Sequence, residues 1–125
     1  MGENRIKLVA ADMDGTLLNR ERKITKYTQD VIKKAMAQGV YFVPATGRAV
    51  NALPPELKEM EGIHYGIFSN GATIYDLKEE KVIYKNHFEM DRVLELMDFL
   101  KQFDLMESIS LNGQSYANKK GNGKY

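Results

Sequence analysis

Two carboxylates separated by a single residue follow a short apolar run near the start of the chain. The segment from Ile6 to Leu18 reads IKLVAADMDGTLL, and its acidic residues are Asp12 and Asp14. An apolar run that begins at polar residues and stops at acidic residues and glycine is typical of a strand buried on both faces of a parallel sheet. Open α/β sheets bind their ligands just beyond the carboxyl ends of such strands. The segment therefore predicts an α/β fold with a site at Asp12 and Asp14.

The acidic pair has the residue types that phosphoryl transfer needs. An Asp carboxylate can attack a phosphoryl group and form an aspartyl-phosphate, which makes Asp12 the candidate nucleophile. A second carboxylate at Asp14 could protonate the leaving oxygen, and both could hold Mg²⁺, which prefers oxygen ligands in the company of phosphate. Gly15 permits a sharp turn after the pair. A solvated Asp-Gly turn without chemistry is the alternative, because that dipeptide is common in turns.

Three segments together resemble the motifs of one protein family. Residues 12–18 (DMDGTLL) look like the first motif of the haloacid dehalogenase superfamily in its DxDGTLL form. Residues 45–48 (ATGR) resemble the second motif, whose Thr or Ser hydroxyl binds phosphate, and residues 69–72 (SNGA) resemble the NGA segment of the Cof-type branch, subclass IIB. Each motif follows a strand-like run, in the order of the family, and the resemblance covers about residues 5 to 105.

The resemblance implies a role for each matching position. Asp12 would be the nucleophile and Asp14 the general acid and base, and the two residues would also bind Mg²⁺. The phosphate and the rest of the substrate would be bound by Met13, Thr46, Gly47, Arg48 and Asn70. Fixed donors aimed at developing negative charge are usually the largest catalytic contribution, which suits the backbone N–H groups of Met13 and Gly47 and the hydroxyl of Thr46. For Arg48, a surface arginine at the start of a helix remains the alternative.

The resemblance also implies the domain organisation. Residues 1–85 would form the N-terminal half of a Rossmann-like core with a parallel sheet, and residues 86–125 would form the beginning of an α/β cap and a polar tail. In the core part, residues 25–39 predict a helix capped by Thr25, and residues 47–60 predict a second helix interrupted by two prolines. Strands are expected at 40–44, 65–68, 73–76 and 81–84, the last two as a hairpin, and residues 17–24 as an exposed flap or hairpin.

In the cap part, apolar residues at helical spacing between 89 and 103 predict an amphipathic helix whose stripe is core. The natural partners of that stripe are cap strands, and only residues 105–111 offer one, so part of the stripe should be exposed or contact another chain. The tail from Asn112 onward is expected to be mobile, because it is rich in glycine and asparagine.

Two groups that complete the family's site do not occur in these 125 residues. Family members return to the core with a Lys that holds the phosphate and with an acidic motif of the GDxxxD type; Lys119 and Lys120 lie in the polar tail and are not assigned to that role. Removing one preorganised group often costs about 10² to 10³ in rate, so this half of a site is expected to turn over little.

The strand at residues 6–11 is central in the family, and its neighbours on one side come from the later half. It is therefore expected to be a bare, apolar edge here. Such an edge invites pairing with another chain, so we predict a homo-oligomer through this edge or a complementary segment.

Composition narrows the function classes. The 18 basic and 17 acidic residues leave a formal charge of +1, which predicts neither nucleic-acid binding nor binding to an anionic membrane. The absence of cysteine suits a reducing cytoplasm, and a polar N-terminus without a long apolar run predicts a soluble cytoplasmic protein. His64 and His87 are too few and too separated to suggest a zinc site.

Two functions from different classes follow. The first is a magnesium-dependent phosphatase of small phosphorylated metabolites, acting through an aspartyl-phosphate. The second is a catalytically inactive relative that acts as a binding or interaction module. A phosphoacceptor domain of the response-regulator type shares the aspartate and metal chemistry, but an acidic pair at the first strand with a TGR segment after the second strand argues against it.

Overall fold

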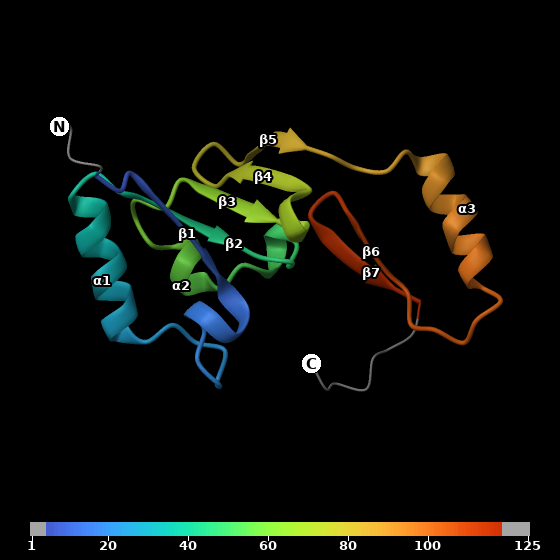
Figure 1. Ribbon diagram of the computed structural model, residues 1–125, viewed down its shortest axis with the longest axis horizontal. Helices are drawn as coiled ribbons and strands as arrows, with labels where there is room; N and C mark the ends of the chain where they lie inside the picture. Colours follow the sequence, from blue (N-terminus) through green and yellow to red (C-terminus); the bar gives the residue numbers. More distant parts are fainter. Residues whose placement is uncertain (1–4, 119–125) are drawn as a thin grey trace. The chain divides into compact units, whose positions relative to one another are not determined.

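A five-stranded sheet organises the first part of the chain in the computed structural model, which describes residues 5–118 (Figure 1). The strand order is β1-β2-β3-β4-β5, in which β1, β2 and β3 are parallel and β3, β4 and β5 are antiparallel. The bounds are β1 (Leu8–Asp12), β2 (Tyr41–Ala45), β3 (Tyr65–Phe68), β4 (Thr73–Asp76) and β5 (Lys81–Lys85). The predicted α/β fold class and the hairpin of β4 and β5 are therefore confirmed.

The helix between β1 and β2 forms as the sequence predicts. Helix α1 (Lys26–Ala37) begins after Thr25, whose side chain accepts a hydrogen bond from the backbone N–H of Thr28 at 3.2 Å. This bond satisfies one of the unpaired donors at the start of the helix. Gly39 follows the helix with φ +81°, the left-handed conformation that commonly ends helices.

The second predicted helix is interrupted at the two prolines, as expected, and its two parts are shorter than predicted. Residues 47–60 contain a 3₁₀ turn, η2 (Val50–Ala52), and a single α-helical turn, α2 (Pro55–Lys58). Proline lacks a donor, and it disfavours helical backbone in the residue before it, so Pro54 and Pro55 break the segment after η2. Pro55 is tolerated as the first residue of α2 because the first N–H of a helix has no partner within it.

The core of this part lies between the sheet and the helices. The connections from β1 to β2 and from β2 to β3 lead to the next strand in the same direction across the sheet. Because such connections between parallel strands are right-handed, the helices in both lie on the same face of the sheet. Its buried residues form one cluster: Met13, Leu18, Ile24, Ile32, Phe42, Leu53, Leu57, Met60, Ile63 and Phe68. The Phe68 ring covers the backbone of Gly66, where a Cβ would lie only 2.5 Å from Phe68 Cε2. Gly66 is therefore required for the ring to enter the core.

Strand β1 is an edge of the sheet in the described part of the chain. It pairs with β2 along its whole length, from Leu8 opposite Tyr41 to Asp12 opposite Ala45, and Leu8 is 53% exposed. The burial on both faces that its apolar composition predicts is therefore wrong, whereas the bare edge that the resemblance implies is present. Strand β1 thus has the apolar composition that is typical of an interior strand, although it lies at the edge of the sheet.

The chain consists of two compact units, Met1–Lys85 and Asn86–Tyr125. The described part of the second unit contains α3 (Met90–Leu100), β6 (Ser108–Leu111) and β7 (Gln114–Ala117). The two strands form an antiparallel hairpin whose two loop residues, Asn112 and Gly113, have φ +50° and +77°. Asn-Gly favours this tight turn. The prediction of a mobile tail from Asn112 onward is therefore wrong for the residues that form the turn and β7. Residues 119–125, which the same prediction covers, lie outside the described residues.

The apolar stripe of α3 is not a buried core. No residue of α3 is buried; the half-buried positions are Val93, Met97 and Leu100, while Leu94 is 53% exposed. The core role expected for the stripe in the intact fold stays a prediction, and the prediction that part of the stripe is exposed is confirmed. In the part of the chain that the structure describes, no helix has the length and apolar character needed to span a membrane.

Candidate active site

A tight turn after β1 presents the two acidic side chains to solvent. The turn η1 (Met13–Leu17) is closed by a hydrogen bond from Leu18 N to Met13 O at 2.9 Å, and its backbone is not helical at Asp14 (ψ 117°) or at Gly15 (φ +79°). Met13 is fully buried, while Asp12 and Asp14 on either side of it are exposed. The buried methionine therefore anchors the turn with both carboxylates directed outward.

Arg48 binds Asp14 with both arms of its guanidinium. Arg48 Nη2 donates to Asp14 Oδ1 at 2.6 Å and Arg48 Nε donates to Asp14 Oδ2 at 2.9 Å. Arg48 Nη1 donates to the carbonyl oxygen of Ala52 at 3.3 Å. Bidentate, charge-assisted pairs of this kind are shorter and stronger than neutral hydrogen bonds. The structure thus brings together two predicted site residues that lie far apart in the sequence.

This pair sets the charge of Asp14. The hydrogen bonds from Arg48 lower the pKa of Asp14 below its ordinary value; burial opposes the shift, and the charges of Arg48 and Arg22 reinforce it. The hydrogen bonds that Arg48 donates to Asp14 raise the pKa of Arg48 in turn. Asp14 is therefore held in its ionised form at neutral pH while the pair is closed.

The loop after β2 is built around Thr46. Thr46 is 6% exposed; its N–H donates to Ile67 O at 2.9 Å, and its carbonyl oxygen accepts from Asn70 N at 3.1 Å. Its Oγ1 accepts from the backbone N–H of Arg48 at 3.1 Å. Because Asp12 pairs with Ala45 in the sheet, this loop begins beside the end of β1. The first two predicted motifs are therefore adjacent in space.

The predicted NGA segment closes over the same loop. Ser69 N donates to Arg48 O at 3.0 Å, and a Cβ on Gly47 would lie 2.8 Å from Asn70 Oδ1. Ser69 and Asn70 both have positive φ, +51° and +56°, and Gly71 follows at +92°. Such backbone strain is held in place by its surroundings and clusters at functional sites. Asn70 therefore lies against Gly47 and brings the third motif to the second.

Asp12 is the least engaged of the predicted site residues. Its carboxylate is approached by the Thr16 hydroxyl, which lies 3.5 Å from Asp12 Oδ2, at the outer limit for a hydrogen bond. Residues 5–118 contain no group of three or more His, Cys, Asp or Glu side chains placed to hold a metal. The potential metal ligands at this site are all oxygen atoms. Among the described residues, the Asp14 carboxylate forms an ion pair with Arg48 and the Asp12 carboxylate forms none. That set fits Mg²⁺, which binds through one or two carboxylates together with water and phosphate.

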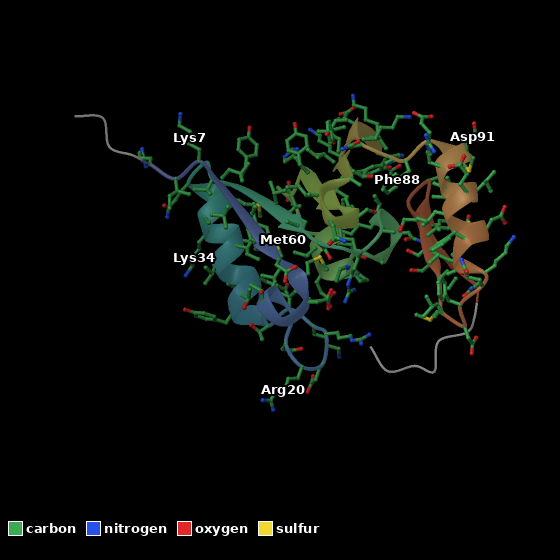
Figure 2. All side chains as sticks on the ribbon, turned by 45° about the vertical axis from the view of Figure 1, so that its right-hand side comes forward. Lys7, Arg20, Lys34, Met60, Phe88 and Asp91 are labelled. Atoms are coloured by element: carbon green, nitrogen blue, oxygen red, sulfur yellow. The ribbon has the colours of Figure 1, made fainter. Side chains whose placement is uncertain are left out.

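The predicted flap is a side-chain-stabilised turn rather than a hairpin of strands. Asn19 Oδ1 accepts from Glu21 N at 3.0 Å and from Lys23 N at 2.9 Å, and Asn19 N donates to Lys23 O at 3.0 Å. Sequence reasoning missed Asn19, although asparagine at the start of a polar turn is a known signal. Arg20 extends from this turn away from the rest of the chain (Figure 2).

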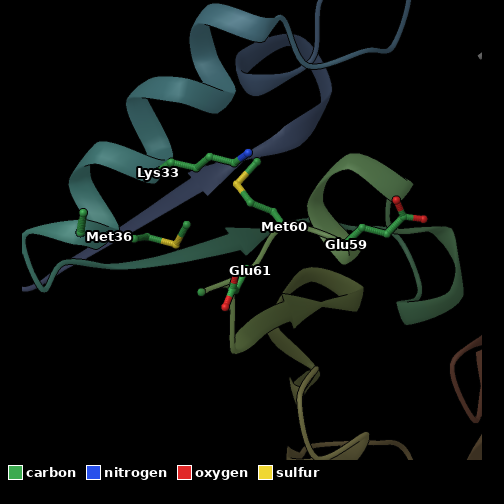
Figure 3. Close-up of a pocket in the computed structure, with 7 residues that line it drawn as sticks. Lys33, Met36, Glu59, Met60 and Glu61 are labelled. Atoms are coloured by element: carbon green, nitrogen blue, oxygen red, sulfur yellow. The ribbon is translucent and has the colours of Figure 1, made fainter.

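A groove of about 590 Å³ opens elsewhere in the first unit (Figure 3). It is lined by Lys33, Met36, Ala37, Glu59, Met60, Glu61 and Gly62. None of these is a predicted site residue, so the groove is separate from the acidic pair.

The fold and the site define a Rossmann-like α/β protein with an acidic site at the ends of parallel strands. Residues 9–125 match the family of haloacid dehalogenase-like hydrolases, and the chain belongs to that family. The family membership that the three sequence motifs predict is therefore confirmed.

Individual relatives agree with this assignment. A candidate phosphatase of Buchnera aphidicola from Schizaphis graminum is 38% identical over 117 residues, which cover 90% of this chain and 41% of the relative. The solved structure of a haloacid dehalogenase-like hydrolase from Bacillus subtilis matches 93% of this chain with a TM-score of 0.81 and 26% identity, over 40% of its own length. The subclass IIB sugar phosphatase BT4131 matches 89% of this chain and 43% of its own, with a TM-score of 0.74 and 29% identity. The chain thus spans about two fifths of the length of these relatives.

Proposed function

We propose that this chain carries the nucleophile side of a magnesium-dependent phosphatase that acts on small phosphorylated metabolites. One observation supports it most strongly: the exposed, unpaired carboxylate of Asp12 ends β1 directly beside Ala45, the residue before Thr46. The sugar phosphatase BT4131 is a structural relative, which favours a small phosphorylated substrate.

The proposed chemistry assigns one step to each side chain. A carboxylate oxygen of Asp12 attacks phosphorus, the bond from phosphorus to the leaving oxygen breaks, and Asp14 supplies the proton to that oxygen. Asp14 then takes a proton from a water that attacks the aspartyl-phosphate, which releases phosphate and restores Asp12. Because Asp14 is ionised in its pair with Arg48, it must first acquire the proton that it donates.

The phosphate would be held by donors from three segments. Met13 and Gly47 offer backbone N–H groups, and Asn70 would orient the substrate beside Gly47. The Thr46 hydroxyl accepts from Arg48 N, so its own hydrogen can be directed to a phosphate oxygen. Donors held in place by the fold stabilise developing charge without reorganisation.

The proposed ligands of Mg²⁺ are the carboxylate of Asp12 and the backbone carbonyl oxygen of Asp14, and the side chain of Asp14 is paired with Arg48. When bound, the ion supplies positive charge that offsets the charge of the phosphate. Both proposed ligands belong to the residues that the resemblance assigns to Mg²⁺.

Metal removal tests the proposal. The chain is expected to release p-nitrophenol slowly from p-nitrophenyl phosphate in Mg²⁺ and to stop in excess EDTA, because one unpaired carboxylate should bind the ion weakly and reversibly. Initial rates at increasing MgCl₂ measure the dependence. Release that is equal with and without EDTA would contradict a magnesium-dependent site.

A second function, an interaction module without catalysis, is favoured by the exposed edge of β1. An unpaired apolar strand offers a row of backbone donors and acceptors to another chain. We expect the chain to self-associate through this edge at micromolar concentration, as measured by light scattering. Leu8→Lys should reduce the associated mass, whereas Val82→Lys on β5, where Val82 is 49% exposed, should leave it unchanged. A monomeric wild-type chain would exclude this mode of association.

A further inference from the structure

We propose that Arg48 is a positioning residue that holds the carboxylate of Asp14 in place, rather than a residue that binds the substrate. The inference rests on the proposed function, in which Asp14 is the acid and base. It differs from the role that the sequence resemblance implies for Arg48.

The geometry of the pair is that of a clamp. Two nitrogens of one planar guanidinium bind the two oxygens of one carboxylate, at 2.6 Å and 2.9 Å. This arrangement defines the plane of the carboxylate as well as its position. The Asp14 side chain is 54% exposed, so few packing contacts are available to hold it by other means. Arg48 is thus the group that restricts the rotamer of Asp14.

Arg48 is itself held by the fold. Its third guanidinium nitrogen donates to Ala52 O at 3.3 Å, its backbone N–H donates to Thr46 Oγ1, and its carbonyl oxygen accepts from Ser69 N. The side chain is 27% exposed. Each guanidinium nitrogen therefore already donates to a protein oxygen, and one N–H remains on each of Nη1 and Nη2. A substrate anion could form a bidentate pair with the Nε–Nη2 edge only by displacing Asp14.

The clamp leaves Asp14 able to act. Each carboxylate oxygen has two acceptor positions, and the guanidinium uses one on each. The remaining position on each oxygen can exchange a proton with the leaving group or with water. Holding a catalytic group in its reactive geometry before the substrate arrives removes part of the entropic cost of the reaction.

The test is nuclear magnetic resonance of the isotope-labelled 125-residue chain without metal. Three-bond couplings report the χ1 rotamer of Asp14 in the wild type, in Arg48→Met and in Arg48→Lys. We expect one rotamer in the wild type and its loss to averaging in Arg48→Met. Averaging should persist in Arg48→Lys, because an ammonium group lacks the planar fork. Arg92→Met, which removes the exposed Arg92–Glu95 pair, is the matched control and should leave Asp14 unchanged.

Titration with inorganic phosphate then separates positioning from substrate binding. We expect the Gly47 amide signal to shift while the Arg48 Nε–H signal keeps the position of the closed pair. An Asp14 rotamer that is unchanged in both Arg48 variants would overturn the inference. The Asp14→Asn variant, in which the ion pair is lost, gives the Arg48 Nε–H signal of the open pair. Movement of the wild-type signal to that position when phosphate is added would also overturn the inference. If phosphate shifts no signal, the proposed phosphate site fails, and the rotamer of Asp14 still decides the role of Arg48.

Discussion

Replacing Asp12 by Asn is expected to abolish hydrolysis of p-nitrophenyl phosphate by this chain. The amide that replaces the carboxylate carries no negative charge and is not a nucleophile toward phosphorus, so the aspartyl-phosphate cannot form. Removing the nucleophile of a catalytic constellation costs several orders of magnitude, and we expect a fall of at least about 10³-fold or to the background rate. Initial rates in Mg²⁺ for the wild type and the variant, purified in parallel, measure it.

The structure gives this comparison a matched control. Asp12 is exposed, and within residues 5–118 its side chain has only the weak contact from Thr16, so the variant should unfold at the same urea concentration as the wild type. Asp91→Asn makes the same chemical change at an exposed residue of α3 and should keep wild-type activity. Equal hydrolysis by the wild type and Asp12→Asn would show that Asp12 is not the nucleophile. Absence of hydrolysis in both would favour the interaction module.

Replacing Phe68 by Ala is expected to lower the free energy of unfolding of the first unit by about 3 to 5 kcal/mol. Phe68 is fully buried at the end of β3, where its ring fills the core and covers Gly66. Truncation loses the burial of the ring and leaves a cavity that the surrounding sheet can close only in part. Because small domains are stable by about 5 to 15 kcal/mol, this one change can remove most of the stability.

Urea denaturation followed by circular dichroism measures the effect of Phe68→Ala. Phe88→Ala is the matched control, since Phe88 is 83% exposed and its removal should change stability by less than about 0.5 kcal/mol. A loss for Phe68→Ala as small as that for Phe88→Ala would show that β3 does not anchor the core. Because Ser69 and Asn70 follow Phe68 directly and bond to the loop of Thr46 and Arg48, this variant should also disturb the proposed site.

Sequence signals that act within a few residues, such as capping residues and apolar spacing, predicted helix α1 correctly. The hydroxyl of Thr25, the apolar spacing after it and Gly39 are sufficient for α1, because capping and periodicity act within a few residues. The same local reasoning anticipated the interruption by two prolines at 47–60 but overestimated how much of that segment is helical. It also overlooked the Asn112-Gly113 turn that makes the hairpin of β6 and β7.

The sequence by itself determined the α/β class, the positions of the three motifs and the ends of the strands that carry them. Strand ends are local, and parallel strands bring their carboxyl ends to one edge, so the adjacency of Asp12 to the loop of Thr46 could be anticipated. Only the tertiary structure decided which site residues pair. Arg48 could contact substrate, solvent or Asp14, and the outcome depends on where η1 turns the carboxylate and where Ala52 and Thr46 hold the arginine. Those contacts join residues that are distant in the chain, and no local pattern specifies their geometry.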